Sequence, residues 1–315
     1  AEFERADAIF AISQSAAQEV IEYTDIASDR VLNISSAVGE EFAVIDYSAE
    51  RIQSLKDKYS LPDEFILTLA MIEPRKPIEA LIHAYSMLPA ELQQRYPMVL
   101  AYKVHPEDLE RILRLAESYG LSRSQLIFTG FLTDDDLIAL YNLCKLFVFP
   151  SLHEGFGLPP LEAMRCGAAT LGSNITSLPE VIGWEDAMFN PHDVQDIRRV
   201  MEKALTDEAF YRELKAHALT QSAKFSWANT AHLAIDGFSR LLQSSKGAHA
   251  GQAEGVTASR IQTMQKIDAL SEVDRLGLAW AVARNGFKQH TRKLLVDISV
   301  LAKHDAKTGI QRVSR

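Results

Sequence analysis

Short apolar runs alternate with amphipathic stretches along most of the chain. The apolar runs that predict buried strands lie at residues 65–70, 98–102, 125–128, 146–149 and 168–171. Between them, apolar residues recur every three or four positions, as Ile78, Leu81, Ile82 and Tyr85 do, which is the spacing of one buried helix face. Strands and helices that alternate in this way predict an α/β fold with a doubly wound parallel sheet, which we place at residues 47–243.

The residues before this sheet predict the end of a separate domain. An apolar strand at 8–12 is followed by Ser13 as a helix N-cap, a helix to about Tyr23 and a second strand at 31–34. The chain starts without an initiator Met and runs almost at once into a strand. We therefore expect residues 1–46 to be the truncated close of an N-terminal domain.

The composition changes after the last helices of the sheet domain, which are predicted at 193–205, 208–223 and 227–242. Residues 244–255 are small, polar and rich in Gly, which is typical of a flexible linker, and helical spacing returns at 258–283. We expect a linker with a helical segment at 244–292. A new apolar run at 293–299 predicts the first strand of a second domain, truncated at residue 315.

Composition narrows the classes of function. The chain has 315 residues, of which 47% are hydrophobic, and its 42 acidic and 33 basic side chains give a net charge of −9. This charge argues against sequence-independent binding to nucleic acid. Cys144 and Cys166, the two cysteines, lie among apolar neighbours and are expected to be core residues in a reducing compartment. With no apolar run long enough for a membrane span and no signal-peptide pattern, we expect a cytoplasmic protein.

The densest cluster of candidate chemistry follows the apolar run 146–149. Glu154, Gly155 and Gly157 form a short loop, after which two prolines predict the start of a helix that includes Glu162. N–H groups at a helix start favour an anion, and glycines let the backbone approach a ligand closely. Two carboxylates beside such donors indicate a ligand with hydroxyl groups, such as a sugar. The alternative is a helix capped by Glu154, with Glu162 solvated on its surface, and spacing alone leaves both interpretations open.

Residues 149–164 resemble the E-x-x-x-x-x-x-x-E signature of the retaining glycosyltransferases of family 4, which have the GT-B architecture and use nucleotide-sugar donors. The resemblance implies a Rossmann-like domain, the donor-binding C-terminal half of such an enzyme. In the family, the first Glu and the following backbone hold the donor's sugar, and the second Glu holds the ribose hydroxyls. The matching residues here are Glu154, Gly155, Phe156, Gly157, Leu158 and Glu162.

Two adjacent cations follow the predicted strand at 65–70. Arg75 and Lys76 can meet a diphosphate, Arg by a bidentate fork and Lys as a point charge. From the residues alone, a solvated surface pair is the simpler interpretation, because exposed Lys and Arg are the rule. Family 4 has a Glu-Pro-Arg-Lys-Asn segment here that neutralises the leaving diphosphate, so the resemblance makes Arg75 and Lys76 catalytic together with Glu154.

Gly130, Phe131 and Leu132 follow the predicted strand at 125–128, and the resemblance implies that this loop holds the base of the donor. Three aspartates come next, at 134–136, but we expect neither a metal nor another cofactor. Acidic residues in the first turn of a helix complement the helix dipole, and the GT-B architecture usually needs no metal.

Together these features predict the donor-binding half of a retaining, metal-independent glycosyltransferase in a tandem polypeptide. By resemblance to tandem enzymes, the donor is GDP-mannose and the product an O-antigen or another bacterial surface polysaccharide. The acceptor is then a glycan or a lipid-linked glycan, and parts beyond this segment would bring the enzyme to the inner face of the cytoplasmic membrane. Two alternatives remain: a nucleotide-sugar epimerase of the same architecture, and a non-catalytic binding half, which departures from the family pattern at Ala37, Ala70 and Pro77 favour.

Overall fold

The computed structural model describes residues 6–69, 78–101 and 105–245 of the chain. These residues divide into two compact units, one that holds Ala37–Phe225 and one in which the residues up to Ser36 pack with those from Ser226 onward. The predicted second domain at 293–315 and nearly all of the predicted linker lie outside the described residues. The predicted domain bounds at 46 and 243 stay predictions.

The larger unit contains a six-stranded sheet in which every neighbouring pair of strands is parallel. The strand order is β5-β4-β3-β6-β7-β8. The strands are β3 (Ile66–Thr68), β4 (Met98–Leu100), β5 (Leu126–Phe128), β6 (Leu146–Phe149), β7 (Thr170–Ser173) and β8 (Met188–Phe189). The predicted parallel α/β fold is therefore confirmed.

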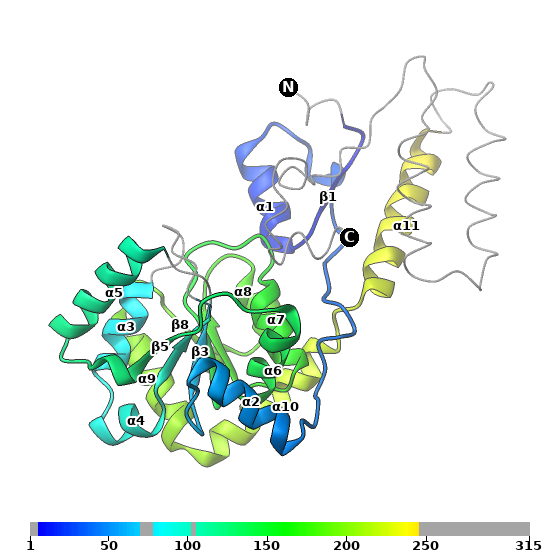
Figure 1. The fold of residues 1–315 in the computed structure, drawn as a ribbon. Coiled ribbons are helices and arrows are strands. Elements are labelled where there is room, and N and C mark those ends of the chain that lie inside the picture. Colours follow the sequence, from blue (N-terminus) through cyan, green and yellow to red (C-terminus); the bar gives the residue numbers. More distant parts are fainter. Residues whose placement is uncertain (1–5, 70–77, 102–104, 246–315) are drawn as a thin grey trace. The chain divides into compact units, whose positions relative to one another are not determined.

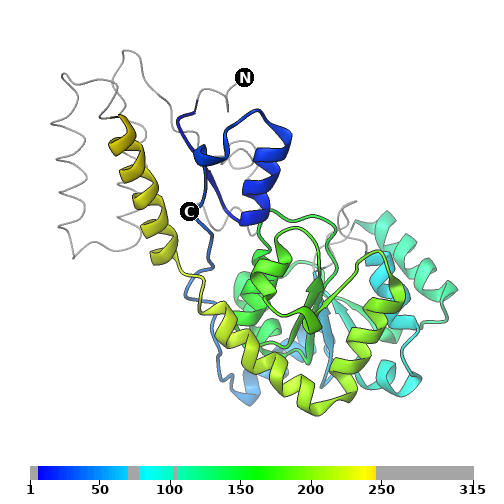
Figure 2. The ribbon, with the colours of Figure 1, turned by 180° about the vertical axis from the view of Figure 1, so that it is seen from behind.

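Helices cover both faces of this sheet. Figure 1 shows α3, α5 and α9 on one face and α2, α6 and α7 on the other, and Figure 2 gives the reverse view. The helices are α2 (Ala49–Tyr59), α3 (Ile78–Ser86), α4 (Ala90–Arg95), α5 (Pro106–Ser118), α6 (Asp134–Leu143), α7 (Leu158–Arg165), α8 (Leu178–Ile182), α9 (Val194–Thr206) and α10 (Glu208–Ser222). No helix of the described residues is long and apolar enough to cross a membrane.

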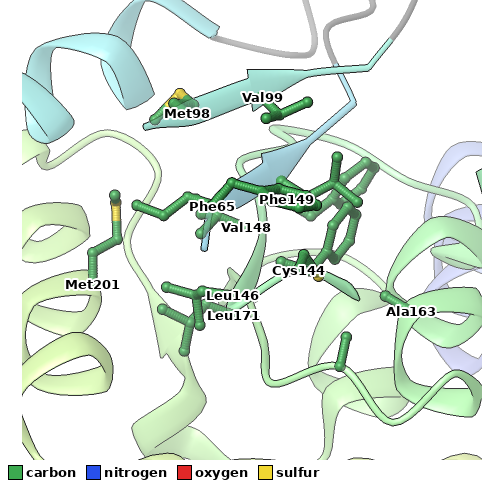
Figure 3. Packing of buried hydrophobic residues seen from close by; sticks show 14 of the residues in the cluster. Phe65, Met98, Val99, Cys144, Leu146, Val148, Phe149, Ala163, Leu171 and Met201 are labelled. Atoms are coloured by element: carbon green, nitrogen blue, oxygen red, sulfur yellow. The ribbon is translucent and has the colours of Figure 1, made fainter. Parts of the chain in front are cut away.

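The core lies between the sheet and its helices because the central strands are apolar on both faces. All four residues of β6 are buried, as are all three residues of both β3 and β4. Figure 3 shows Met98 of β4, Phe149 of β6 and Phe65, which directly precedes β3, packed together with Met201 of α9 and Ala163 of α7. Strands buried on both faces are typical of parallel sheets, which explains why their sequences are continuous apolar runs.

The smaller unit combines a βα unit from the start of the chain with a helix that is distant in the sequence. It contains β1 (Ile9–Ala11), α1 (Gln14–Tyr23), β2 (Val31–Asn33) and α11 (Trp227–Ser245), with β1 and β2 parallel. Ser13 caps α1 as predicted, because its Oγ accepts a hydrogen bond of 2.9 Å from the N–H of Ala16. In α11, Phe238 packs edge-on against Phe10 of β1 with 5.1 Å between the ring centroids. Residues more than 200 positions apart in the sequence thus share one small core.

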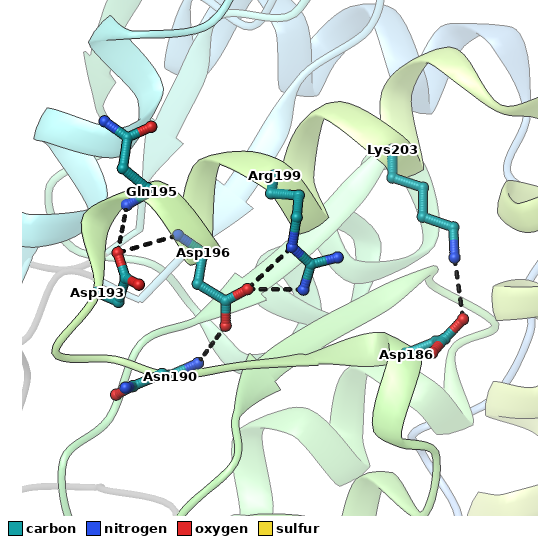
Figure 4. A network of polar contacts seen from close by, with 7 residues as sticks. All are labelled: Asp186, Asn190, Asp193, Gln195, Asp196, Arg199 and Lys203. Atoms are coloured by element: carbon teal, nitrogen blue, oxygen red, sulfur yellow. Dashed lines mark hydrogen bonds and ion pairs between the residues drawn. The ribbon is translucent and has the colours of Figure 1, made fainter.

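Polar contacts fix the start of α9. At the start of α9, Asp193 Oδ1 accepts from the N–H of Gln195 at 2.9 Å, and Asp196 accepts from the N–H of Asn190 while it pairs with Arg199 (Figure 4). These contacts join β8 to α9 and follow the general preference for Asp at helix starts.

The first turn of α6 contains a buried ionic cluster. The carboxylate of Asp136, with a side chain 4% exposed, lies 2.5 Å from Nη2 of Arg51 and 2.7 Å from Nζ of Lys58. The hydroxyl of Tyr59 also donates to it, at 2.6 Å. Burial by itself raises the pKa of Asp136, but the hydrogen bonds from Lys58, Tyr59 and Arg51 outweigh burial and hold the pKa well below its usual value. The cluster ties α2 to the start of α6.

We expect Asp136→Asn to lower the free energy of unfolding at pH 7 by about 1–3 kcal/mol, since it leaves charged donors and a buried hydroxyl without the carboxylate. A depressed folded-state pKa stabilises the fold above the unfolded-state pKa of about 4 and loses this effect as the pH falls below it. The deficit of Asp136→Asn should therefore shrink below pH 4. Urea unfolding between pH 3 and 8 measures it, with Asp135→Asn, an exposed neighbour in the same turn, as the control. A deficit that is absent, or that does not depend on pH, would contradict this assignment.

Candidate functional site

The strand order changes direction between β3 and β6. From β3 the chain proceeds to β4 and β5 on one side, and then from β6 to β7 and β8 on the other. In open parallel sheets, ligands bind outside the carboxyl ends of the strands at such a switch point. The loop that contains Glu154 directly follows the carboxyl end of β6, so the fold places this candidate residue at the switch point.

Hydrogen bonds hold Glu154 on both sides. Ser151 Oγ lies 2.9 Å from Glu154 Oε1. The backbone N–H of Glu154 donates to Thr176 Oγ1 at 3.1 Å, and Ser177 Oγ donates to the carbonyl oxygen of Glu154 at 2.9 Å. The loop after β7 therefore fastens the loop after β6, and the position of Glu154 depends on both strands.

Gly157 begins α7 in a conformation that favours glycine. Its φ is +102° and its ψ is 51°, and a Cβ added there would lie 2.7 Å from Leu178 Cδ2. A side chain at this position would need both a strained backbone and a shift of Leu178. The helix N-cap is thus Gly157 and not Glu154, which contradicts the interpretation of Glu154 as a capping residue.

The start of α7 has fewer N–H donors than an ordinary helix. Pro159 and Pro160 lack an N–H, and the N–H of Leu161 donates to the carbonyl oxygen of Gly157 at 3.3 Å. Any donors toward a ligand at this end therefore come from the backbone of residues 155–158. This narrows the predicted anion site to the loop itself.

The side chains of Phe156 and Leu158 belong to the core. Phe156 packs edge-on against Phe225 with 5.6 Å between the ring centroids, and Leu158 joins the same cluster with Leu161 and Val181. These two residues can serve a ligand only through their backbone. Their side chains anchor the loop so that its backbone is held in one place.

Glu162 is buried in the body of the larger unit. It is 4% exposed, and one of its carboxylate oxygens, Oε2, accepts a hydrogen bond of 3.0 Å from the hydroxyl of Tyr141. The interpretation of Glu162 as a solvated surface residue is therefore wrong. Burying a carboxylate costs free energy unless hydrogen bonds compensate, and the hydroxyl of Tyr141 supplies one such hydrogen bond to Glu162.

The loop after β5 differs from the loop after β6 because it exposes an aromatic side chain. Gly130 adopts a positive φ of 69°, and the side chain of Phe131 is 69% exposed. Leu132 packs against the core, and Thr133 caps α6 by accepting from the N–H of Asp136 at 3.2 Å. The loop is thus fixed at its helical end and presents an aromatic ring to solvent at its tip.

The remaining predicted site residues, Arg75 and Lys76, lie outside the described residues. Within the described part of the chain, no group of three or more His, Cys, Asp or Glu side chains is arranged to hold a metal ion. Cys144 and Cys166 are both buried free thiols. Burial, followed by the nearby charge of Glu162, raises the pKa of Cys166 to about 12, so it is no nucleophile at neutral pH.

Four residues that support the two glutamates were not found from the sequence: Tyr141, Ser151, Thr176 and Ser177. Tyr141 lies on the apolar stripe of its helix, and this spacing indicates only a core residue. The available signal was its hydroxyl, because a buried Tyr usually needs a hydrogen-bond partner. Nothing local in the sequence of the loop after β7 connects Thr176 or Ser177 to Glu154.

Comparison with known proteins gives a consistent set of relatives. The family described as "Glycosyl transferases group 1" matches residues 51–223. The chain is 96% identical over 315 residues to the serotype-specific mannosyltransferase WbdA of Escherichia coli, which covers 100% of this chain but only 39% of that protein. It is 34% identical over 235 residues to the O-antigen chain mannosyltransferase B of Escherichia coli, covering 74% of this chain and 60% of the relative.

A solved structure shares the fold. HepE of Anabaena, crystallised with UDP and glucose, superposes with a TM-score of 0.63 at 18% identity, covering 74% of this chain and 63% of that one. At this identity the likeness shows the fold alone. The family match covers more than half of the chain and contains the switch point and both loops of the candidate site. The chain therefore belongs to the group 1 glycosyl transferases.

Proposed function

We propose that this chain binds the nucleotide-sugar donor of a retaining glycosyltransferase of family 4. The observation that carries the proposal is the placement of Glu154 and Glu162 in one loop–helix segment at the switch point, in a chain of this family. Glu154, in the loop, holds the reacting sugar. Glu162, in the helix, holds the ribose. Residues 155–158 lie between the two glutamates in the sequence, and their backbone N–H groups donate hydrogen bonds to a phosphate or sugar oxygen of the donor.

Charge stabilisation completes the mechanism. When the glycosidic bond to the diphosphate breaks, negative charge grows on the leaving group and positive charge on the sugar. Arg75 and Lys76, which follow β3 in the sequence, neutralise the diphosphate, and electrostatic stabilisation usually lowers the barrier of such a reaction more than any other effect. The loop of Gly130, Phe131 and Leu132 receives the base. No metal or other cofactor takes part.

The donor sugar we propose is mannose, linked to GDP, and the product an O-antigen. The support is that two relatives, at 96% and 34% identity, are called mannosyltransferases and that one is named for the O-antigen chain. Because the chain spans about 39% of the length of the first of these relatives, acceptor binding and a second transferase domain belong to the proposal for the longer protein.

Two alternatives compete with sugar transfer. A nucleotide-sugar epimerase would convert the donor without an acceptor, and a non-catalytic half would bind the donor without turnover. The family match favours transfer over epimerisation. Product analysis after incubation of a longer enzyme that contains this chain with GDP-mannose and a glycan acceptor separates the three. A transferase releases GDP together with an extended acceptor, an epimerase produces an isomeric GDP-sugar, and a non-catalytic half leaves the donor unchanged.

The proposed function makes three predictions, of which the first concerns metal. The proposed phosphate partners are side-chain cations and backbone N–H groups, so the chain should bind GDP with the same affinity with and without a chelator such as EDTA. Isothermal titration with GDP, and with UDP in parallel, measures this. Loss of binding on adding the chelator would show that a metal ion is required.

The second prediction separates the two glutamates. Glu162→Ala should weaken nucleotide binding by about 1–3 kcal/mol, because it removes hydrogen bonds that exist before and during the reaction. Glu154→Ala should lower turnover far more than nucleotide affinity, because its carboxylate faces the sugar that becomes positively charged. Both are measured in a longer enzyme that contains this chain, with the exposed Glu213→Ala on α10 as the control. If Glu154→Ala weakens GDP binding as Glu162→Ala does and leaves turnover at saturation intact, the two roles are wrongly assigned.

The third prediction concerns the isolated chain. Catalysis between two domains needs both walls of the cleft to exclude water and orient the acceptor. The 315-residue chain should therefore bind donor nucleotide yet transfer no mannose to a glycan acceptor, while a longer enzyme that contains it does. Efficient transfer by the chain alone, detected as radiolabelled product, would refute this division of labour.

A further inference from the structure

We propose that Tyr141 is a positioning residue for nucleotide recognition: its hydroxyl fixes the direction in which Glu162 presents its carboxylate to the ribose. This inference rests on the proposed function. It adds a residue from α6, a helix that contributes no contact to the donor in that proposal.

The contact joins two helices inside the core. Tyr141 belongs to α6 and is completely buried, and its hydroxyl lies 3.0 Å from Oε2 of Glu162 on α7. Both groups are shielded from water. A hydrogen bond to a charged acceptor in such surroundings is stronger and more directional than one at the surface.

The ring of Tyr141 has little freedom to move. It packs edge-on against Phe147 of β6, with 5.3 Å between centroids and 85° between the ring planes. On another side it packs against Phe42, at 6.4 Å and 55°. Because neighbours from two other segments hold the ring, the O–H of Tyr141 lies at a fixed point. It can therefore hold the longer side chain of Glu162 in one direction.

The carboxylate of Glu162 needs a fixed hydrogen-bond donor to orient it. This carboxylate stands at the end of three rotatable bonds, whereas a ribose presents two adjacent hydroxyls whose donors require a defined direction. A carboxylate has about four lone-pair sites, so accepting one bond from Tyr141 is compatible with accepting further bonds from a diol. The phenol O–H therefore fixes the rotamer and itself occupies only one of the acceptor sites of the carboxylate.

A purely stabilising role for the same hydrogen bond makes a different prediction. If the hydroxyl only compensates the burial of Glu162, its removal would lower stability and weaken all nucleotides equally. If it positions Glu162 for the ribose, its removal would weaken only those ligands that carry the ribose hydroxyls.

The test is Tyr141→Phe in the 315-residue chain, which keeps the ring and its packing. Isothermal titration compares GDP with 2′,3′-dideoxy-GDP, and UDP with its dideoxy form. The unaltered chain should prefer the ribose form. In Tyr141→Phe we expect this preference to fall about fivefold or more, with the affinity for the dideoxy form unchanged within about twofold. Glu162→Gln should reduce the preference as well, and the double variant should reduce it no further than the stronger single variant, because both act through one contact.

Tyr85→Phe is the matched control. Tyr85 is also completely buried, and its hydroxyl donates to the carbonyl oxygens of Gln93 and Tyr96, so the variant loses a buried hydroxyl bond elsewhere in the same unit. It should lower the melting temperature and leave the ribose preference intact.

The possible results separate cleanly. A ribose preference that survives Tyr141→Phe, or an equal weakening of both forms, overturns the positioning role. An unaltered chain that binds GDP or UDP without preferring the ribose form overturns the assignment of Glu162, and the role of Tyr141 with it. An unaltered chain that binds none of the four nucleotides refutes the proposed function itself.

Discussion

In a parallel sheet the carboxyl ends of all strands lie along one edge, and ligands bind there at the point where the strand order reverses. In this chain the reversal falls between β3 and β6. Every feature of the candidate site follows from this constraint. The loop of Glu154 continues β6, the loop that fastens it continues β7, and the loop with the exposed Phe131 continues β5. Residues distant in sequence thus come to one edge without any long connection.

Burial of the apolar strands keeps their carboxyl ends in place. Because β6 is buried on both faces between β3 and β7, its carboxyl end cannot shift without disturbing the core. The positive φ of Gly157 then turns the chain into α7, while Phe156 anchors the turn in an apolar cluster. The backbone of this loop is therefore held by packing on both of its sides, which is the condition for preorganised hydrogen bonds.

The sequence was informative wherever the structure follows a local rule. The parallel sheet, the extent of β6, the cap Ser13 and the start of α7 at the prolines all follow from apolar runs and helix-start residues. β7 was placed two residues too early, because Ala168 is apolar but still bonded to α7, its N–H donating to the carbonyl oxygen of Ala163 at 3.0 Å. β8, with two residues, is too short to give a pattern.

Long-range contacts were not predictable in the same way. Asp136 has the sequence context of a solvated acid in a first turn, yet Arg51 and Lys58 from a helix about 80 positions earlier enclose it. Tyr141 has the spacing of a core residue, which it is, and its hydroxyl acquires a role only because α6 and α7 pack side by side. A pattern in one helix contains no information about which helix will pack against it.

The two glutamates are supported in different ways, and the difference fits their proposed roles. Glu154 lies in a loop and is partly exposed. Ser151 Oγ lies beside its carboxylate, its N–H donates to Thr176 Oγ1 and its carbonyl oxygen accepts from Ser177 Oγ, and these three hydroxyls can turn with small movements of the loops. Glu162 lies on a helix, buried, against a phenol locked by aromatic packing. A reacting sugar changes shape and charge during transfer, whereas the ribose does not. An adjustable support near the bond that breaks and a rigid support at the nucleotide would therefore let binding energy from the unreactive part of the donor orient the part that reacts.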